Sequence, residues 1–225
     1  VEGLYEMWDE LRARHPGLWI DNCSSGGRRI NLETCMRSVP LWRSDTNCSP
    51  GHEEWTQSHT AGLCSLIPLN TACAWTPDSY VMRSTLTAGL ICQWDYLNGD
   101  FPMKEALSNL AELKELRKYW YGDFYPLTSG DPSPELWCGW QLHRPDLDAG
   151  MAMVFRRAES PYTGWMLCLQ ALDPKALYRV EIREGDNPAN SEDLSGEALM
   201  TGREIKLPPR SSLLVRYKKL APSGG

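Results

Sequence analysis

The sequence predicts an α/β region that forms half of a (β/α)8 barrel, followed by an all-β region that forms an antiparallel β-sandwich. Two observations support this prediction. Over residues 1–125, segments with helical periodicity alternate with short apolar runs, which is typical of parallel βαβ units. Over residues 126–225, short alternating segments lie between Pro, Gly and Asp turns, which is typical of antiparallel strands. We therefore predict two domains with these bounds.

The predicted half barrel begins with a helix over residues 2–14, where apolar residues recur at helical spacing before Pro16. A short apolar run at 18–20 predicts the first strand. Three more helix and strand pairs follow, with helices expected at 30–38, 52–64 and 79–87 and strands at 39–42, 66–75 and 90–94. Four parallel strands are half the number that closes a (β/α)8 barrel.

A long amphipathic helix is expected to start at Pro102, since proline suits the first helical position. The expected buried face of this helix carries Leu107, Leu110, Leu113 and Leu116. Strands of the β-sandwich are expected at 137–143, 151–157, 165–169, 178–182 and 213–217. The turns between them suit antiparallel connections.

Composition and charge exclude several classes of function. The chain has 42% hydrophobic residues, 23% charged residues and a formal net charge of -6, so it lacks the excess of cations that nucleic-acid binding requires. The sequence shows neither an apolar run long enough to span a membrane nor the pattern of a signal peptide. We therefore expect a soluble, cytoplasmic protein without nucleic-acid or membrane partners, whose eight cysteines are reduced.

Two short segments place chemically useful groups at the expected C-terminal ends of the first two strands. Residues 21–27 are rich in small side chains, which allow a tight turn and the close approach of a ligand, and residues 42–45 end in a carboxylate. In a (β/α)8 barrel the active groups gather at this end of the strands. Taken alone, Asp45 is more typical of an Asx-turn or a helix N-cap, and Cys23 of a small buried hydrophobe. Gly26 alone is typical of a turn with positive φ.

Together the two segments resemble the glycoside hydrolase family 36 α-galactosidases. The matching blocks of that family are Glu/Asp-Asn-Cys-Ala/Ser-Ser-Gly-Gly and Trp-Thr/Arg-Ser-Asp, in the same order and at a similar spacing. The resemblance implies that Asp45 is the general acid/base of a retaining glycosidase, and that Cys23 and Gly26 line a subsite for an α-galactoside-like carbohydrate. Trp42 is expected either to contact the sugar or to pack beneath the strand. Neither a cofactor nor a metal is expected.

One part of the family's machinery is missing from the sequence. The nucleophile of the family is the aspartate of a Lys-Trp-Asp segment, which this sequence does not contain. Trp8-Asp9 falls in the first predicted helix and Trp94-Asp95 ends the last predicted barrel strand, so neither matches in position. The resemblance therefore implies the C-terminal portion of such an enzyme, namely barrel units 5–8 and the β-sandwich. We expect little or no glycosidase turnover from the isolated chain, because a retaining enzyme needs two carboxyl groups.

Two other classes of function remain open from the sequence. One is a hydrolase of other specificity, for example toward activated esters, that uses groups at the barrel mouth such as Asp45, Asp95, His52 or Cys23. The other is a carbohydrate-binding module without catalysis. A metal site is not expected, because His52 and His59 have no evident third ligand.

Half a barrel leaves two strand edges unpaired and its barrel-facing side chains exposed. Two copies arranged around a common axis would supply eight strands with two-fold symmetry. We therefore expect a homodimer that forms through the half-barrel edges. A monodisperse monomer in sedimentation or light scattering would contradict this expectation.

Overall fold

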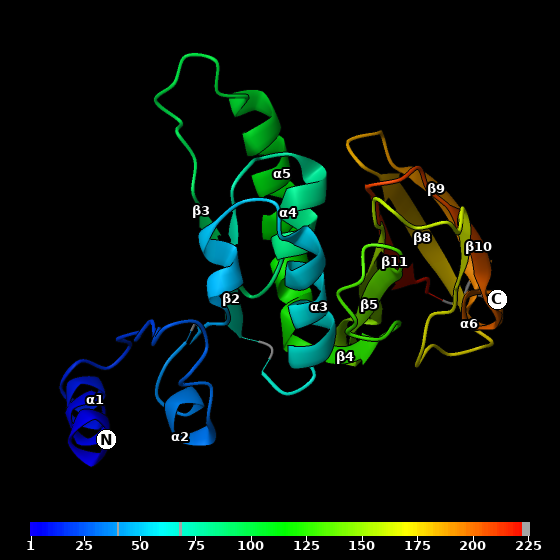
Figure 1. Ribbon diagram of the computed structural model, residues 1–225. Helices are drawn as coiled ribbons and strands as arrows, with labels where there is room; N and C mark the ends of the chain where they lie inside the picture. The colour runs from blue at the N-terminus through cyan, green and yellow to red at the C-terminus, as the bar shows by residue number, and fades with distance from the viewer. Residues whose placement is uncertain (40, 68, 222–225) are drawn as a thin grey trace.

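The computed structural model describes residues 1–39, 41–67 and 69–221. A small parallel sheet flanked by helices comes first, and a larger antiparallel sheet follows (Figure 1). The predicted order of an α/β region before a β region is therefore confirmed. Residues 222–225, which end the second predicted domain, lie outside the described residues, as do Pro40 and Pro68, which fall within two predicted strands.

The first region alternates helices with parallel strands. Its elements are α1 (Glu2–Arg14), α2 (Leu32–Cys35), β1 (Leu41–Trp42), the 3₁₀ helix η1 (Asp45–Cys48), α3 (Glu53–Leu63), β2 (Asn70–Ala74), α4 (Ser79–Thr85), β3 (Gly89–Cys92), α5 (Met103–Leu116) and the 3₁₀ helix η2 (Arg117–Tyr121). The strands pair in parallel in the order β1-β2-β3. Helices α3, α4 and α5 lie between this sheet and the large sheet (Figure 1). No helix among the described residues is both long and apolar enough to cross a membrane.

The strand predicted at 18–20 does not form, so the parallel sheet has three strands where four were expected. Next to this segment, Asn22 makes a single parallel bridge with Leu41. The segment lies at the outer edge of the sheet, where Leu18 is 40% exposed and Trp19 is 74% exposed. A strand of a parallel sheet is stabilised by burial on both faces, which this edge does not provide.

Helix α5 begins at Met103, one residue after the predicted start, and three of the four predicted leucines, Leu110, Leu113 and Leu116, pack inward. Its buried side chains are Ala106, Asn109, Glu112, Leu113 and Leu116. Leu107, which the leucine spacing placed on the buried face, is 59% exposed. Glu112 is buried in this part of the helix because its carboxylate accepts hydrogen bonds from Arg83. The spacing of leucines could not reveal that polar partner.

The second region is built from antiparallel strands. Its elements are β4 (Asp123–Pro126), β5 (Trp137–Arg144), the 3₁₀ helix η3 (Pro145–Leu147), β6 (Ala149–Arg156), β7 (Gly164–Leu167), β8 (Leu177–Glu184), β9 (Asn190–Ser195), α6 (Gly196–Thr201), β10 (Arg203–Lys206) and β11 (Ser211–Lys219). Six strands form one sheet in the order β4-β5-β6-β11-β8-β9, and β10 pairs with β7 separately. Five strands overlap the predicted segments. The sequence did not predict β4, β9 and β10, because they are short or lack an alternating apolar pattern.

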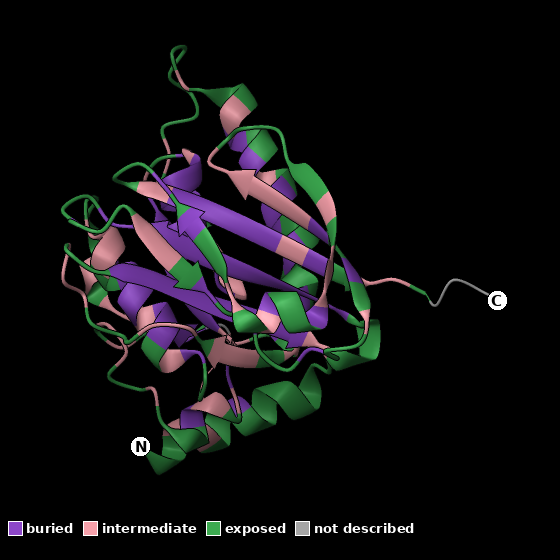
Figure 2. Ribbon diagram, turned by 90° about the vertical axis from the view of Figure 1, so that its right-hand side faces the viewer, coloured by how far each residue is buried: buried purple, intermediate pink, exposed green. Residues whose placement is uncertain are grey.

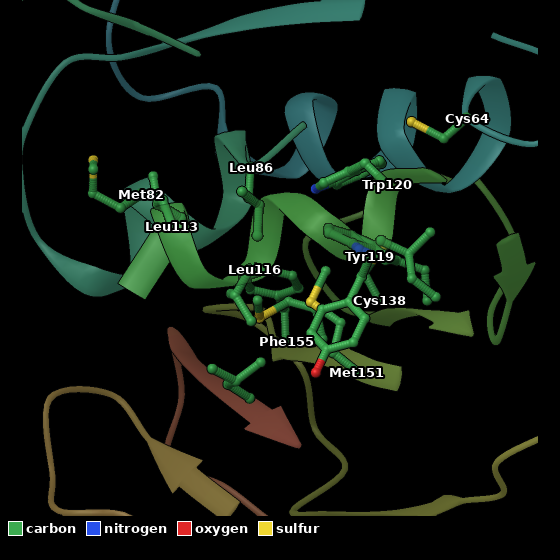
Figure 3. Packing of buried hydrophobic residues seen from close by; sticks show 14 of the residues in the cluster. Cys64, Met82, Leu86, Leu113, Leu116, Tyr119, Trp120, Cys138, Met151 and Phe155 are labelled. Carbon is green, nitrogen blue, oxygen red and sulfur yellow. The ribbon is translucent and has the colours of Figure 1, made fainter. Parts of the chain in front are cut away.

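Both faces of the large sheet are covered. Phe155 of β6 packs toward the helices, in a cluster that includes Trp120 (Figure 3). Trp140 of β5 belongs to the same cluster. Val154 and Val215 belong to a second cluster, which includes residues of β7 and β10. Successive side chains of a strand point to opposite faces, so one strand contributes to both clusters. Figure 2 shows the result, with the long strands mainly buried and α1 mainly exposed.

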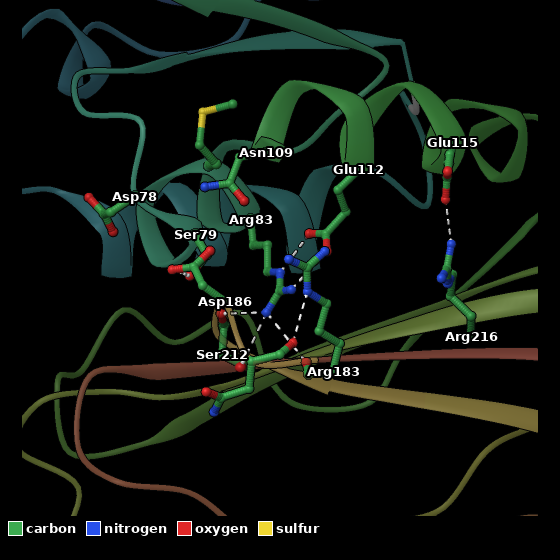
Figure 4. A network of polar contacts seen from close by, with 12 residues as sticks. Asp78, Ser79, Arg83, Asn109, Glu112, Glu115, Arg183, Asp186, Ser212 and Arg216 are labelled. Carbon is green, nitrogen blue, oxygen red and sulfur yellow. Dashed lines mark hydrogen bonds and ion pairs between the residues drawn. The ribbon is translucent and has the colours of Figure 1, made fainter. Parts of the chain in front are cut away.

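Buried polar groups join the helices to the large sheet. Arg83 of α4 donates to both carboxylate oxygens of Glu112, at 2.8 and 2.9 Å, and to Ser212 Oγ of β11 at 3.2 Å (Figure 4). Arg183 of β8 donates to Glu112 as well, at 3.0 Å. Arg157, which directly follows β6, is fully buried and donates hydrogen bonds to α3. The two regions are therefore held together by specific polar contacts as well as by apolar packing.

Candidate functional site

A hollow of 630 Å³ lies at the C-terminal end of the three-stranded sheet. Its wall is formed by Asp21, Cys23, Trp42, Asp45, Asn47, Cys48, Thr71, Cys73, Trp75, Ile91 and Gln93. The strands are parallel, so their C-terminal ends meet at one edge and bring together residues that are distant in the sequence. The hollow combines two carboxylates, two amides and a hydroxyl with two indole rings, which is a suitable wall for a small polar ligand with apolar faces.

Two glycines bring the glycine-rich turn into contact with the segment that follows β1. Gly26 and Gly27 have positive φ angles of 65° and 80°. A Cβ atom on Gly26 would lie 2.8 Å from Cγ of Asp45, and one on Gly27 would lie 2.4 Å from the carbonyl oxygen of Arg43. No side chain fits at either position, so both need glycine. The two segments that stand out in the sequence therefore touch each other in the fold.

Asp45 is the first residue of η1, three residues after the end of β1. Ser44 caps this helix, since its Oγ accepts a hydrogen bond from the Thr46 N–H at 3.2 Å. Asp45 is thus not the cap, and its carboxylate faces the hollow. Its Oδ1 accepts hydrogen bonds from Trp42 Nε1 at 3.0 Å and from Cys48 Sγ at 3.7 Å. Burial, and next to it the charge of Asp45, raises the pKa of Cys48. The thiol therefore stays protonated and donates a hydrogen bond to the carboxylate.

Arg43 holds the end of β1 in place from the opposite face of the sheet. It is buried, and its guanidinium donates to Thr60 Oγ1 at 2.8 Å, Thr56 O at 2.8 Å and Asn70 Oδ1 at 3.2 Å. All three acceptors are neutral, and burial lowers the pKa of Arg43 to about 10. These bonds fix the end of β1, just before the helix that carries Asp45, against α3 and β2.

Three of the four site residues expected from the sequence line the hollow. Cys23, Trp42 and Asp45 all form part of its wall. Cys23 is exposed, so it is not a small buried hydrophobe. Trp42 lines the hollow and also donates to Asp45, so it combines contact with the hollow and support of the carboxylate. Gly26 lies outside the wall and packs closely against Asp45.

The other groups considered from the sequence lie elsewhere. Asp95 and His52 do not belong to the wall of the hollow. His52 Nε2 lies 3.1 Å from Ser49 Oγ. His59 packs near Arg43, and burial and the Arg43 charge lower its pKa to about 4. Within the described ranges, no three His, Cys, Asp or Glu side chains gather in a way that could hold a metal ion.

Sequence reasoning missed most of the remaining wall. Asn47, Thr71 and Trp75 were not among the predicted site residues, although Thr71 and Trp75 both belong to the strand predicted at 66–75. Asp21 was noted only as part of the glycine-rich segment. Position near a C-terminal strand end was the available signal. That signal does not say which side of the strand a residue faces, which is the property that selects the wall.

The sequence has recognisable relatives. No family model matches it. Alpha-galactosidase 1 of Pediococcus pentosaceus is 25% identical to it over 167 residues, which make up 69% of this chain and 22% of that protein. The chain therefore spans about a fifth of the length of this curated relative.

Solved structures match nearly the whole chain. The galactosidase domain of the alpha-galactosidase-sucrose kinase AgaSK matches with a TM-score of 0.76 at 20% identity, over 97% of this chain and 31% of that one. A variant of the family 36 α-galactosidase AgaA from Geobacillus stearothermophilus, in complex with raffinose, matches with a TM-score of 0.75 at 19% identity and the same coverage. The chain has the fold of part of a family 36 α-galactosidase. The family 36 resemblance that the two motifs suggested is confirmed at the level of the fold.

Proposed function

We propose that the hollow binds an α-galactoside and that Asp45 acts there as the acid/base half of a retaining glycosidase. The observation that carries this proposal is the contact between Gly26 and Asp45, which joins the two motifs at the edge of the hollow on a family 36 fold. Raffinose is a suitable first ligand, because the related AgaA variant was solved in complex with it.

The surroundings of Asp45 suit proton transfer. In a retaining mechanism the carboxyl group first protonates the leaving oxygen and then removes a proton from water. The hydrogen bonds from Trp42 and Cys48 both go to Oδ1, and Oδ2 lies beside Gly26. The indole bond also limits the rotation of the carboxylate, so Asp45 is held in one orientation toward the hollow.

The nucleophile is the missing part of this machinery. We infer that residues 1–125 correspond to half of the catalytic barrel and residues 126–225 to a β-sandwich domain, and the sequence contains no Lys-Trp-Asp segment. Retaining hydrolysis needs a second carboxylate about 5–5.5 Å from the acid/base. The isolated chain is therefore expected to bind galactosides and to turn them over slowly or not at all.

Binding and turnover should be measured separately. Raffinose binding would be followed by calorimetry, and turnover with chromogenic α-galactosides, for wild type, Asp45→Asn and Asp95→Asn. Asp95 is the matched control, because it is an aspartate outside the wall of the hollow. We expect the wild type and Asp95→Asn to bind raffinose alike, and any residual turnover to disappear only in Asp45→Asn. Absence of binding, or turnover that survives Asp45→Asn, would refute the proposal.

We also propose that the parallel sheet pairs with a second copy of the chain. A two-fold axis parallel to the strands would bring the edge near residues 18–22 of one copy beside β3 of the other, twice, and would keep all pairs parallel. Both edges are flanked by hollows with apolar residues, of 340 Å³ beside residues 18–20 and of 310 Å³ between β3 and α5. Sedimentation should show a dimer, and a monodisperse monomer would exclude this arrangement.

A further inference from the structure

Two buried polar atoms in the wall of the hollow have no hydrogen-bond partner within the described part of the chain. They are Asn47 Oδ1 and Thr71 Oγ1. Both residues are 3% exposed, so little of either is available to bulk water. Buried polar atoms in folded proteins are nearly always paired, and leaving one unpaired destabilises the fold. Their position in the wall suggests that something bound in the hollow provides the pairing.

The hydrogen bonds around Asn47 fix which end of its amide is free. Thr56 Oγ1 donates its only proton to the carbonyl oxygen of His52 at 2.9 Å. It can therefore only accept from Asn47, whose Nδ2 lies 2.5 Å away. The amide nitrogen is thus directed to Thr56, and Oδ1 is left as an acceptor. The backbone carbonyl oxygen of Asn47 is also fixed, because Trp75 Nε1 donates a hydrogen bond to it at 3.0 Å.

The alternation of side chains along β2 directs Thr71 into the hollow. Asn70, its neighbour, points to the opposite face, where its Oδ1 accepts from Arg43. Successive residues of a strand face opposite sides, so Thr71 faces the side on which Trp42 and Asp45 line the hollow. Its hydroxyl can donate one hydrogen bond and accept others.

We propose that Asn47 Oδ1 and Thr71 Oγ1 each bind a hydroxyl group of a neutral ring sugar. This rests on the proposed sugar-binding function and names two groups that recognise the ligand. Asn47 Oδ1 and the carboxylates of Asp21 and Asp45 all accept hydrogen bonds, so the ligand must offer several donors and no negative charge. The indoles of Trp42 and Trp75 add apolar surface for the C–H face of a sugar ring.

The test uses the isosteric variant Thr71→Val, with Thr71→Ser as a control that keeps the hydroxyl. Calorimetry would give the affinity for methyl α-galactoside, for its monodeoxy analogues, and for methyl α-glucoside and methyl α-mannoside. We expect Thr71→Val to bind about tenfold or more weakly than wild type, because one hydrogen bond to the ligand is lost, and Thr71→Ser to stay close to wild type. One deoxy analogue should lose affinity for wild type but not for Thr71→Val.

A second measurement separates recognition from folding. Without ligand, Thr71→Val should melt at the same temperature as wild type or higher, because the variant removes an unpaired buried hydroxyl. Equal galactoside affinity in Thr71→Val and wild type would overturn the inference and leave the proposed function intact. Thr71-dependent binding of glucoside or mannoside only would support the inference and refute the proposed galactoside. Binding of none of these sugars would overturn both.

Discussion

The parallel sheet and the six-stranded sheet differ in how completely each is covered. Strands β1, β2 and β3 have two, five and four residues, whereas β5 and β6 have eight each and are almost wholly buried. Large side chains near the open edge of the parallel sheet stay exposed, among them Trp19 at 74% and Met36 at 62%. The large sheet is therefore covered on both faces, by the helices of the first region and by β7 and β10. The hollow belongs to the sheet whose edge stays open.

The difference extends to the buried cations. Arg83 joins the two regions and has Glu112 as a charged partner, whereas the acceptors of Arg43 in the described part of the chain are all neutral. A buried charge with a hydrogen-bonded partner of opposite sign is strongly destabilised when that partner is removed. The joint between the regions is thus the place where one substitution should have the largest effect.

Glu112→Ala should destabilise the protein most. It would leave Arg83 buried without its carboxylate, at a cost of about 3–5 kcal/mol in the free energy of unfolding. Glu115→Ala is the control, because Glu115 is on the same helix, is largely exposed and also pairs with an arginine of the large sheet, Arg216. The control should lose less than about 1 kcal/mol. Urea unfolding followed by tryptophan fluorescence would measure the loss of unfolding free energy in both variants. Similar losses would contradict a special role of the Arg83–Glu112 pair in joining the two regions.

Gly27→Ala should have the next largest effect, confined to the first region. The added Cβ would meet the Arg43 carbonyl at 2.4 Å and the φ of 80° disfavours alanine, for a combined cost of about 2–4 kcal/mol. Gly51→Ala is a matched control, because its φ is 82° and an added Cβ meets nothing within 4 Å. The control should cost about 1 kcal/mol, from the backbone alone. Equal melting temperatures for the two variants would show that the close packing beside Asp45 does not matter.

Acid should weaken the first region through His59. Burial lowers the pKa of this histidine from 6.5 to about 4, so the unfolded chain binds a proton more readily than the folded one. The contribution of His59 to the free energy of unfolding is fully present above pH 6.5 and is lost as the pH falls toward 4. For a partly exposed group this loss is about 1–2 kcal/mol. His59→Gln should flatten the stability curve over that range. The pH dependence that remains in this variant should come from His143 of β5, because burial lowers the pKa of His143 as well. A curve as steep as that of wild type would exclude His59 as the cause.

Trp19→Ser should change stability least and association most. The side chain is largely exposed, so the unfolding free energy of the monomer should change by less than about 0.5 kcal/mol. If the open edge pairs with a second copy, the dimer dissociation constant should rise. Tyr162→Ser is the control, because Tyr162 is 64% exposed in the second region, away from the edge. Analytical ultracentrifugation of the two variants would decide, and identical dissociation constants would argue against the edge as the interface.

Much of the fold could be predicted because its signals are local. The helical spacing over 2–14 matches α1 almost residue for residue, and five segments of the second region match strands. The predictions that failed concern burial by distant partners. The run at 18–20 has the composition of a strand but lacks a neighbour on its outer side, and Leu107 lies on a helix face that the rest of the fold leaves exposed.

The sequence by itself singled out two short motifs that contain Gly26, Gly27 and Asp45 and placed them at neighbouring strand ends, and the structure brings them into contact. Only the tertiary structure decided the rest of the wall. Asn47 and Thr71 face the hollow because of the hydrogen bond to Thr56 and the alternation along β2, respectively. Which side chains face the hollow depends on how each helix or strand packs against its neighbours. That packing is set by contacts between residues that are distant in the sequence, and the local residue type does not determine it.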